Sequence, residues 1–170
     1  VAFVHPGSGG SALNWPAERF GEVAAQLAAS GWRVFLTGGP ADAEAVRRAA
    51  AAAGPGVADT AGRWDLREFL GVLSGGDVLV GPSTGPLHMA AALGLAVAGV
   101  YPPLPVQSIG RWGPRGERVR AVAPALDCPA RLTCRGERCR HWNCLERINV
   151  SDVVALARAA RAERQGESTE

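Results

Sequence analysis

The fold of this chain is decided by the stretch Asp77-Val78-Leu79-Val80-Gly81-Pro82-Ser83-Thr84-Gly85-Pro86-Leu87-His88. Its first part, 77–80, is a short apolar run typical of a buried strand, and the small apolar residues at 87–93 favour a helix. Between them lies a turn rich in Gly, Ser, Thr and Pro. The stretch therefore predicts a strand that passes through a tight turn into a helix, which is the repeating unit of α/β proteins.

The turn between this strand and this helix has the chemistry of a phosphate site. A helix start presents unpaired backbone N–H groups and the positive end of the helix dipole, and both attract an anion. Thr84 adds a hydroxyl donor, Gly85 lets a ligand approach the backbone, and His88 adds a ring nitrogen one turn further on. The alternative is an ordinary strand-to-helix turn followed by a buried histidine.

Strand-like and helix-like patterns alternate along the chain up to Tyr101. We predict strands at 1–4, 33–36, 57–59, 77–80 and 97–101, and helices at 16–30, 41–53, 65 to about 73, and 87–93. This alternation predicts an α/β fold with a doubly wound parallel sheet of the Rossmann-like kind. Ligands of such sheets bind outside the carboxyl ends of the strands, so the loops after the strands form the predicted site.

Two of these loops carry further candidate residues. The loop after the first strand contains Ser8, Gly9 and Gly10, which permit a close approach to a pyrophosphate. It matches neither the P-loop nor the Gly-x-Gly-x-x-Gly pattern. After the second strand, Asp42 and Glu44 compete to accept a hydrogen bond from a sugar or ribose hydroxyl. The alternative is that both carboxylates only complement the helix dipole.

Several segments, in order, resemble the ADP-heptose:lipopolysaccharide heptosyltransferases, a family of bacterial glycosyltransferases (glycosyltransferase family 9). They are His5-Pro6-Gly7-Ser8-Gly9-Gly10 followed by 14–20, Thr37-Gly38-Gly39-Pro40, Ala61-Gly62 before Leu66, Ser83-Thr84-Gly85-Pro86-Leu87-His88, and Cys144-Leu145-Glu146-Arg147-Ile148. The resemblance spans nearly the whole chain.

The resemblance implies that residues 1–164 form the C-terminal, nucleotide-sugar-binding half of a two-domain GT-B glycosyltransferase. The donor would be a nucleotide diphosphate sugar, ADP-heptose by analogy. The acceptor would be a cell-envelope glycan or glycolipid, held by an N-terminal domain absent from this sequence. His88 would be catalytic, and no metal or other cofactor is implied. The donor-binding residues would be Ser8, Gly9, Gly10, Glu44, Leu66, Ser83, Thr84, Gly85 and Pro86, with Leu66 packing on the base.

Two positions depart from the family pattern. Ser83 stands where members usually carry an acidic residue, and Leu13 stands where they usually carry a lysine. In the family this lysine supplies charge to the donor phosphates, so its loss removes a charge-assisted contact worth about 1.5–3 kcal/mol. Either Arg111 or Arg115 substitutes, or the donor differs, or the site has decayed. A degenerate, non-catalytic α/β binding module and another nucleotide-sugar enzyme, such as a 2-epimerase, therefore stay open.

Composition narrows the class of protein. The net charge of +2 over 170 residues is too small to indicate a nucleic-acid partner, and a hydrophobic content of 47% favours a folded domain. No apolar run is long enough to cross a bilayer, and no signal peptide is visible. These observations favour a cytoplasmic protein, with peripheral association at the inner face of the membrane implied by the resemblance. The chain starts inside a core strand without an initiating Met, which favours a fragment cut at a domain boundary.

The segment 102–149 has a weaker pattern and contains all four cysteines. Their spacing lacks the Cys-x-x-Cys pairs of most structural zinc sites, so free thiols, disulfides and zinc all remain open. A last helix is predicted at 151–164, capped by Ser151 or Asp152, and residues 165–170 are predicted to be a disordered tail.

Overall fold

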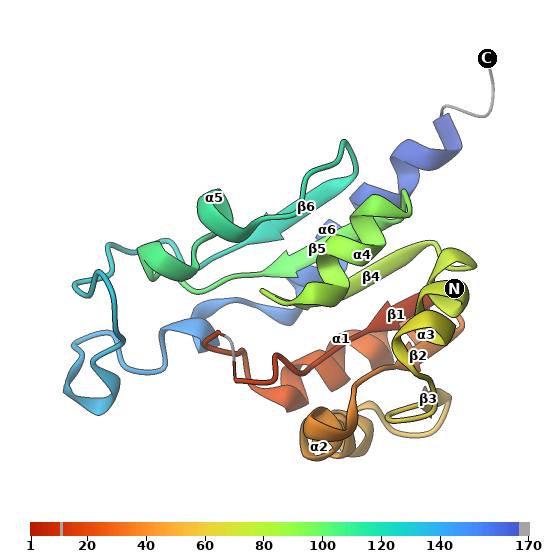
Figure 1. Ribbon diagram of the computed structural model, residues 1–170. Coiled ribbons are helices and arrows are strands. Elements are labelled where there is room, and N and C mark those ends of the chain that lie inside the picture. Colours follow the sequence, from red (N-terminus) through yellow and green to blue (C-terminus); the bar gives the residue numbers. More distant parts are fainter. Residues whose placement is uncertain (11, 167–170) are drawn as a thin grey trace.

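In the computed structural model, which describes residues 1–10 and 12–166, six parallel strands form one sheet (Figure 1). The strands are β1 Ala2–Val4, β2 Val34–Leu36, β3 Val57–Asp59, β4 Val78–Pro82, β5 Ala96–Val100 and β6 Val119–Val122. Their order across the sheet is β3-β2-β1-β4-β5-β6, and each neighbouring pair is parallel. The predicted doubly wound parallel sheet is confirmed.

The strand order reverses between β1 and β4, at the centre of the sheet. From this point β2 and β3 extend to one edge, and β5 and β6 extend to the other. The chain segments that follow β1 and β4 therefore leave the sheet in opposite directions and open a crevice between them. A hydrogen bond of 2.8 Å from the His5 amide to the Val80 carbonyl holds the two strand ends together below this crevice.

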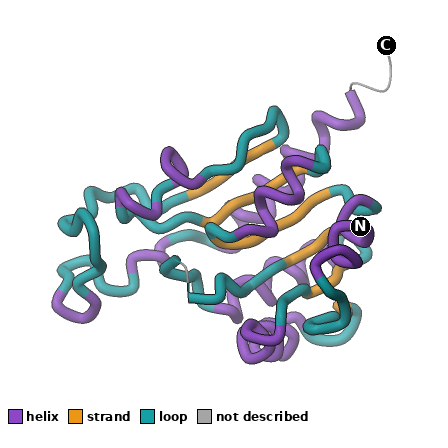
Figure 2. Tube along the Cα trace, in the orientation of Figure 1, coloured by secondary structure: helices purple, strands orange, loops and turns teal. Residues whose placement is uncertain are grey.

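Helices cover both faces of the sheet (Figure 2). They are α1 Ala17–Ala29, α2 Ala43–Ala53, α3 Leu66–Ser74, α4 Gly85–Ala92, α5 Ile109–Trp112 and α6 Val150–Gly166. Short 3₁₀ turns occur at Pro40–Asp42, Pro105–Gln107, Gly136–Arg138 and Cys144–Arg147. In Figure 1, α3 and α4 lie in front of the sheet and α1 and α6 lie behind it.

Alternation along each strand divides the core between these two layers. In β1, Val4 belongs to the larger core cluster with residues of α1, α2 and α6, whereas its neighbour Phe3 belongs to the cluster with residues of α3 and α4. In β4, Val80 and Leu79 divide in the same way. Successive strand side chains point to opposite faces, so a fully buried strand must be apolar at every position. This requirement explains the continuous apolar runs.

The turn that opens the site is tighter than predicted. β4 continues through Pro82, which pairs with Val100 of β5, and α4 begins at Gly85 rather than at Leu87. Pro86 occupies the first turn of α4, where its missing N–H costs no hydrogen bond and its fixed φ suits the helix. Only Ser83 and Thr84 therefore separate the strand from the helix.

One strand was missed in the prediction. β6 lies within the segment 102–149, at the edge of the sheet, and its four side chains are all half-buried. Arg120 stands in its centre, so its sequence lacks a continuous apolar run. Pairing with the buried β5 places this strand, and that contact is between residues far apart in the sequence.

The last helix also differs from the prediction at both ends. It begins at Val150, so Ser151 and Asp152 lie inside its first turn and do not precede it as caps. It continues through Gly166, which makes the predicted tail wrong for residues 165 and 166. The rest of that predicted tail, residues 167–170, lies outside the described residues.

Candidate functional site

Two adjoining cavities open at the carboxyl ends of the strands. The larger, of about 570 Å³, is lined from the segments after β1, β2 and β3 and from α3 and α4. The smaller, of about 490 Å³, is lined by the start of α4 and by parts of the segment 106–112. Thr84 lines both cavities. Both cavities thus lie among the loops after the strands, which are the loops in which the sequence predicted a site.

Thr84 and Gly85 form the entrance to helix α4. Thr84 is the N-cap residue and has extended backbone angles, but its side chain makes no capping hydrogen bond. Gly85 is exposed, and a Cβ added to it would meet no atom closer than 3.9 Å. The first amides of α4 therefore lie at an open surface next to a hydroxyl group. That arrangement suits an anion, because helix amides at this end have no partner within the helix.

Asp42 ties the first two loops of the larger cavity together. Its carboxylate accepts a hydrogen bond of 3.2 Å from the amide of Gly9 and one of 3.1 Å from the amide of Gly39. Gly7 has no side chain at the place where the carboxylate lies, since an added Cβ would stand 2.0 Å from Asp42 Oδ1. The glycines of the first loop thus make room for this carboxylate as well as for a ligand.

His5 lies beneath these loops at the end of β1 and is buried. Its Nδ1 atom is 3.0 Å from Thr37 Oγ1, and its Nε2 atom is 3.8 Å from Asp42 Oδ2. Burial lowers the pKa of His5, and the nearby Asp42 carboxylate opposes this shift with a smaller effect. We therefore treat the imidazole as neutral, so the 3.8 Å contact is not an ion pair.

Apolar side chains also line the larger cavity. Trp64 and Phe69 are nearly parallel, with ring centroids 6.5 Å apart, and both line the cavity together with Leu66 and Met89. The side chain of Leu66 is 61% exposed, so Leu66 does not belong to the core. Aromatic and aliphatic side chains beside polar groups are a lining that fits an aromatic base.

Polar residues and a tryptophan line the smaller cavity. Ser83, Gly85 and His88 line it from the turn and α4, and Gln107 and Trp112 line it from the segment after β5. The amide oxygen Oε1 of Gln107 accepts a 3.0 Å hydrogen bond from the backbone N–H of Leu13. This bond joins the segment after β5 to the loop after β1. His88 is exposed, so the alternative of a buried histidine in this turn is excluded.

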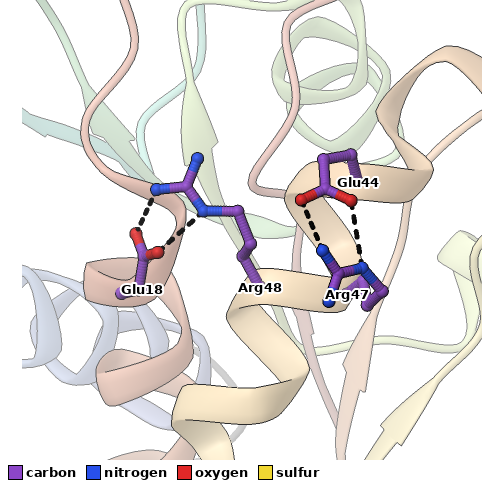
Figure 3. Close-up of polar contacts among 4 residues, drawn as sticks. All are labelled: Glu18, Glu44, Arg47 and Arg48. Carbon is purple, nitrogen blue, oxygen red and sulfur yellow. Dashed lines mark hydrogen bonds and ion pairs between the residues drawn. The ribbon is translucent and has the colours of Figure 1, made fainter.

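The structure brings most of the predicted site residues to these cavities. Ser8, Gly9, Leu66, Thr84 and Pro86 line the larger one, and Ser83, Thr84, Gly85 and His88 line the smaller one. Gly10 and Glu44 line neither. Glu44 is exposed and its carboxylate is bound twice by Arg47, as Figure 3 shows. Of the two competing acidic residues, the structure places Asp42 and not Glu44 in the cavity.

Some lining residues escaped the sequence-based prediction. Met89, Gln107 and Trp112 were not singled out, although all three line a cavity. Met89 lies on the predicted helix one turn after Gly85, so helical periodicity could have identified it. Gln107 and Trp112 lie in the weakly patterned segment, where no local signal pointed to the site.

The missing lysine has no cationic replacement at either cavity. Leu13 lines a separate cavity, and neither Arg111 nor Arg115 lines the larger or the smaller one. Among the described residues that line these two cavities there is no Lys or Arg. Within the described residues, the groups at these cavities that suit an anion are the first amides of α4, the Thr84 hydroxyl and the His88 ring.

All four cysteines line a third cavity, of about 290 Å³, at some distance along the sequence from the turn at 83–84. They are half-buried free thiols, and burial raises the pKa of Cys144, with smaller contributions from the other three thiols. Within the described residues no three His, Cys, Asp or Glu side chains are arranged to hold a metal ion. Over the same residues, the helices are too short or too polar to cross a membrane.

The fold and the paired cavities define an α/β domain of the Rossmann-like class with a candidate ligand site at the carboxyl ends of its strands. The chain belongs to glycosyltransferase family 9 (heptosyltransferase), whose model matches residues 1–138. A protein of Haemophilus influenzae named "Putative glycosyltransferase" is 33% identical over 123 residues, which cover 71% of this chain and 36% of that protein.

Solved structures share the fold. E. coli ADP-heptose lps heptosyltransferase II matches with a TM-score of 0.79 and 22% identity, over 96% of this chain and 47% of that chain. E. coli heptosyltransferase WaaC with ADP matches with a TM-score of 0.71 and 24% identity, over 94% of this chain and 43% of that chain. The chain thus spans little more than a third of the curated relative and less than half of each heptosyltransferase.

Proposed function

We propose that residues 1–164 are the donor-binding domain of a heptosyltransferase-like glycosyltransferase and hold a nucleotide diphosphate sugar. The observation that carries this proposal is the meeting of the two cavities at Thr84, at the start of helix α4. A sugar nucleotide has a base and a sugar at its two ends and an anionic diphosphate between them. The cavities offer an apolar wall at one end, a polar pocket at the other and an anion site between.

The base and ribose are assigned to the larger cavity. Trp64, Leu66 and Phe69 supply the apolar wall on which a base can pack. The carboxylate of Asp42 lines the same cavity, where it can accept a hydrogen bond from a ribose hydroxyl. The structures of relatives include one with ADP, which makes adenine the base to test first.

The diphosphate is assigned to the start of α4. The amide of Gly9 already donates to Asp42, and the hydroxyl of Ser8 donates to the Ala12 carbonyl over 3.3 Å. A diphosphate placed against Asp42 would meet a negative charge, whereas the amides near Gly85 and the hydroxyl of Thr84 offer hydrogen-bond donors. The loop at 8–10 therefore borders the phosphates, and α4 supplies most of the attraction.

The sugar is assigned to the smaller cavity, beside His88. During transfer the bond from the anomeric carbon to the diphosphate breaks, its electron pair leaves with the phosphate oxygen, and a new bond forms to the acceptor oxygen. His88 and the α4 amides stabilise the charge that develops on the departing oxygen. By the family resemblance, the carboxylate that takes the acceptor proton belongs to an N-terminal domain outside this sequence.

The remaining parts of the proposal follow from the family. The acceptor is a cell-envelope glycan or glycolipid, and the full-length protein works in lipopolysaccharide biosynthesis. Its location would be the cytoplasm, at the inner face of the membrane. Neither a further cofactor nor a nucleic acid takes part.

Calorimetric titration of the chain with ADP, UDP and GDP tests the proposal. We expect saturable binding with a preference for ADP. Preference for another base would retain the sugar-nucleotide site and change the donor. Absence of heat with all three, from a sample shown to be folded, would contradict a donor site in this chain.

The role of His88 needs the full-length enzyme. We expect His88→Ala to lower glycosyl transfer by at least about tenfold, which is the scale of one lost electrostatic contact to the leaving group. Arg111→Ala is a matched control from the rim of this region, because Arg111 lines neither cavity. Equal activity of wild type and His88→Ala would remove His88 from the catalytic step.

A second candidate function is a non-catalytic sugar-nucleotide-binding or interaction module. The specific observation in its favour is the lack of Lys and Arg among the described residues that line the two cavities. Binding of ADP-heptose by the chain together with no transfer by the full-length protein would support this candidate.

A further inference from the structure

Trp112 is an unusual residue on the side of the smaller cavity. Its side chain is 53% exposed, although tryptophan is usually well buried. The indole N–H donates a 2.9 Å hydrogen bond to the Val106 carbonyl. This bond fixes one edge of the ring and satisfies its polar atom, so the surface that the ring offers to the cavity is hydrocarbon.

The backbone of Trp112 is fixed as well. The hydroxyl of Tyr101 donates a 3.2 Å hydrogen bond to the Trp112 carbonyl. Burial raises the pKa of Tyr101 to about 12, and a hydrogen bond from Ser83 opposes this shift with a smaller effect. Tyr101 therefore stays protonated at neutral pH and keeps donating to Trp112.

These contacts connect Trp112 to the turn at 83–84. Ser83 donates a hydrogen bond to the Tyr101 hydroxyl, which in turn donates one to the Trp112 carbonyl. The serine that stands in place of the family's acidic residue is therefore part of this network. Ser83 and Trp112 line the same cavity, whereas Tyr101 supports both from the core. The ring is held in a set position relative to His88 before any ligand binds. A preformed position of this kind lowers the entropy cost of binding.

We infer that Trp112 is a sugar-contacting, specificity-determining residue, on whose indole ring the pyranose ring of the donor packs. This inference rests on the proposed function, and it identifies the donor sugar as the group that occupies the smaller cavity. A sugar ring has an apolar surface of C–H groups and a rim of hydroxyls. The Trp112 ring can pack against the C–H surface. Polar groups of Ser83, Gln107 and His88 line the same cavity and can form hydrogen bonds with the hydroxyls.

The effect of Trp112 is confined to one end of the ligand. Trp112 lines the smaller cavity and not the larger one, and Thr84 is the residue common to both. Its removal should therefore weaken the binding of a sugar nucleotide and leave the binding of the free nucleotide unchanged. A residue that only maintains the fold would affect both ligands.

The test is calorimetric titration of the whole chain with ADP and with ADP-heptose, in wild type, Trp112→Ala and Trp112→Phe. We expect Trp112→Ala to weaken ADP-heptose binding about tenfold, as for loss of one well-packed aromatic contact, and to leave ADP binding unchanged. Trp112→Phe should weaken ADP-heptose binding less, because it retains an aromatic ring. Trp142→Ala is the matched control, since Trp142 is similarly exposed, at 52%, and lines the third cavity instead.

A second measurement keeps the inference testable if Trp112→Ala does not fold. ADP-heptose should change the tryptophan fluorescence of wild type more than ADP does, and this difference should vanish in Trp112→Phe. If wild type binds ADP but the Trp112 variants bind ADP-heptose as tightly as wild type, the inference is wrong and the nucleotide site stands. Equal weakening of both ligands would also overturn it. If wild type binds neither ligand, the inference fails together with the proposed function.

Discussion

At the scale of single residues, Asp42 determines how the loops around the larger cavity are arranged. It connects the amides of Gly9 and Gly39, which belong to loops after different strands, and it occupies space that only a glycine at position 7 leaves open. Its sequence neighbourhood suggested a ligand-binding carboxylate or a dipole-compensating one. The structure adds a third role, because the same carboxylate holds two loops at a set separation.

We expect Asp42→Ala to lower the free energy of unfolding by about 2 kcal/mol, because two charge-assisted hydrogen bonds are lost. The loosened loops should also weaken ADP binding by about tenfold. Urea denaturation and calorimetry measure the two effects. Glu44→Ala is the control, since its exposed pair with Arg47 contributes less than about 1 kcal/mol. Identical stability and affinity in the two variants would refute the role of Asp42.

His5 should make the stability of the protein depend on pH. Burial lowers its pKa in the folded chain below the value near 6.5 that an exposed histidine has, so the unfolded chain takes up a proton more readily. The stabilisation is therefore complete above about pH 6.5 and is lost as the pH falls below it. In His5→Asn, whose amide can still reach Thr37, the loss of unfolding free energy between about pH 7.5 and about pH 5.5 should be smaller. An equal loss of unfolding free energy in wild type and variant, measured by urea denaturation at the two pH values, would contradict this.

At the scale of elements, helix α3 presents the apolar wall of the larger cavity. Its start is fixed by a reciprocal capping box between Asp65 and Glu68. Asp65 accepts a 2.8 Å bond from the amide of Glu68, and Glu68 accepts a 2.9 Å bond from the amide of Asp65. Leu66 and Phe69 follow directly, so the cap sets the position of both side chains.

Asp65→Ala should lower the free energy of unfolding by about 1 kcal/mol, as expected for loss of an N-cap. Binding of ADP should weaken as the first turn of α3 frays, whereas Arg67→Ala, an exposed change in the same turn, should alter neither quantity. Thermal unfolding measures the change in stability, and calorimetric titration measures the change in ADP binding. A change of equal size in Arg67→Ala would show that the cap is not the cause.

Among the elements, those with strong local signals were predicted correctly, the short and mostly exposed β3 was predicted as well, and β6 was missed. Buried β1, β2, β4 and β5 have continuous apolar runs, and the periodic helices α1 and α2 lie between them. β6 has an arginine in its centre, and its formation depends on β5, so no local pattern identified it. The same reason hid Trp112, whose place beside the site depends on contacts with Val106 and Tyr101.

At the scale of the whole molecule, the chain is a sheet with a layer of helices on either face (Figure 1), and the two cavities lie at the carboxyl ends of its strands. It covers less than half of the heptosyltransferases with the same fold. In our proposal a sugar nucleotide bound at Thr84 lies in two cavities of this chain, and the acceptor is held outside it. Binding and transfer are thus expected to be separable properties.

We expect the 170-residue chain alone to bind ADP-heptose and to show no transfer to an added acceptor. The physical reason is that the base for the acceptor hydroxyl is proposed to lie outside the chain. Mass spectrometry of the acceptor after incubation measures transfer, and the full-length enzyme is the control. A glycosylated product formed by the chain alone would contradict the separation of the two roles.

The sequence by itself determined the doubly wound sheet, the tight turn from β4 into α4 and the cap of α3. Each of these depends on residues close together in the chain, through apolar runs, glycine placement or hydrogen bonds within one turn. Only the tertiary structure decided that Asp42 and not Glu44 faces the cavity, that Leu66 is exposed, and that Trp112 lies beside His88's cavity. These outcomes depend on how separate strands and loops pack together, and no local pattern records such long-range contacts.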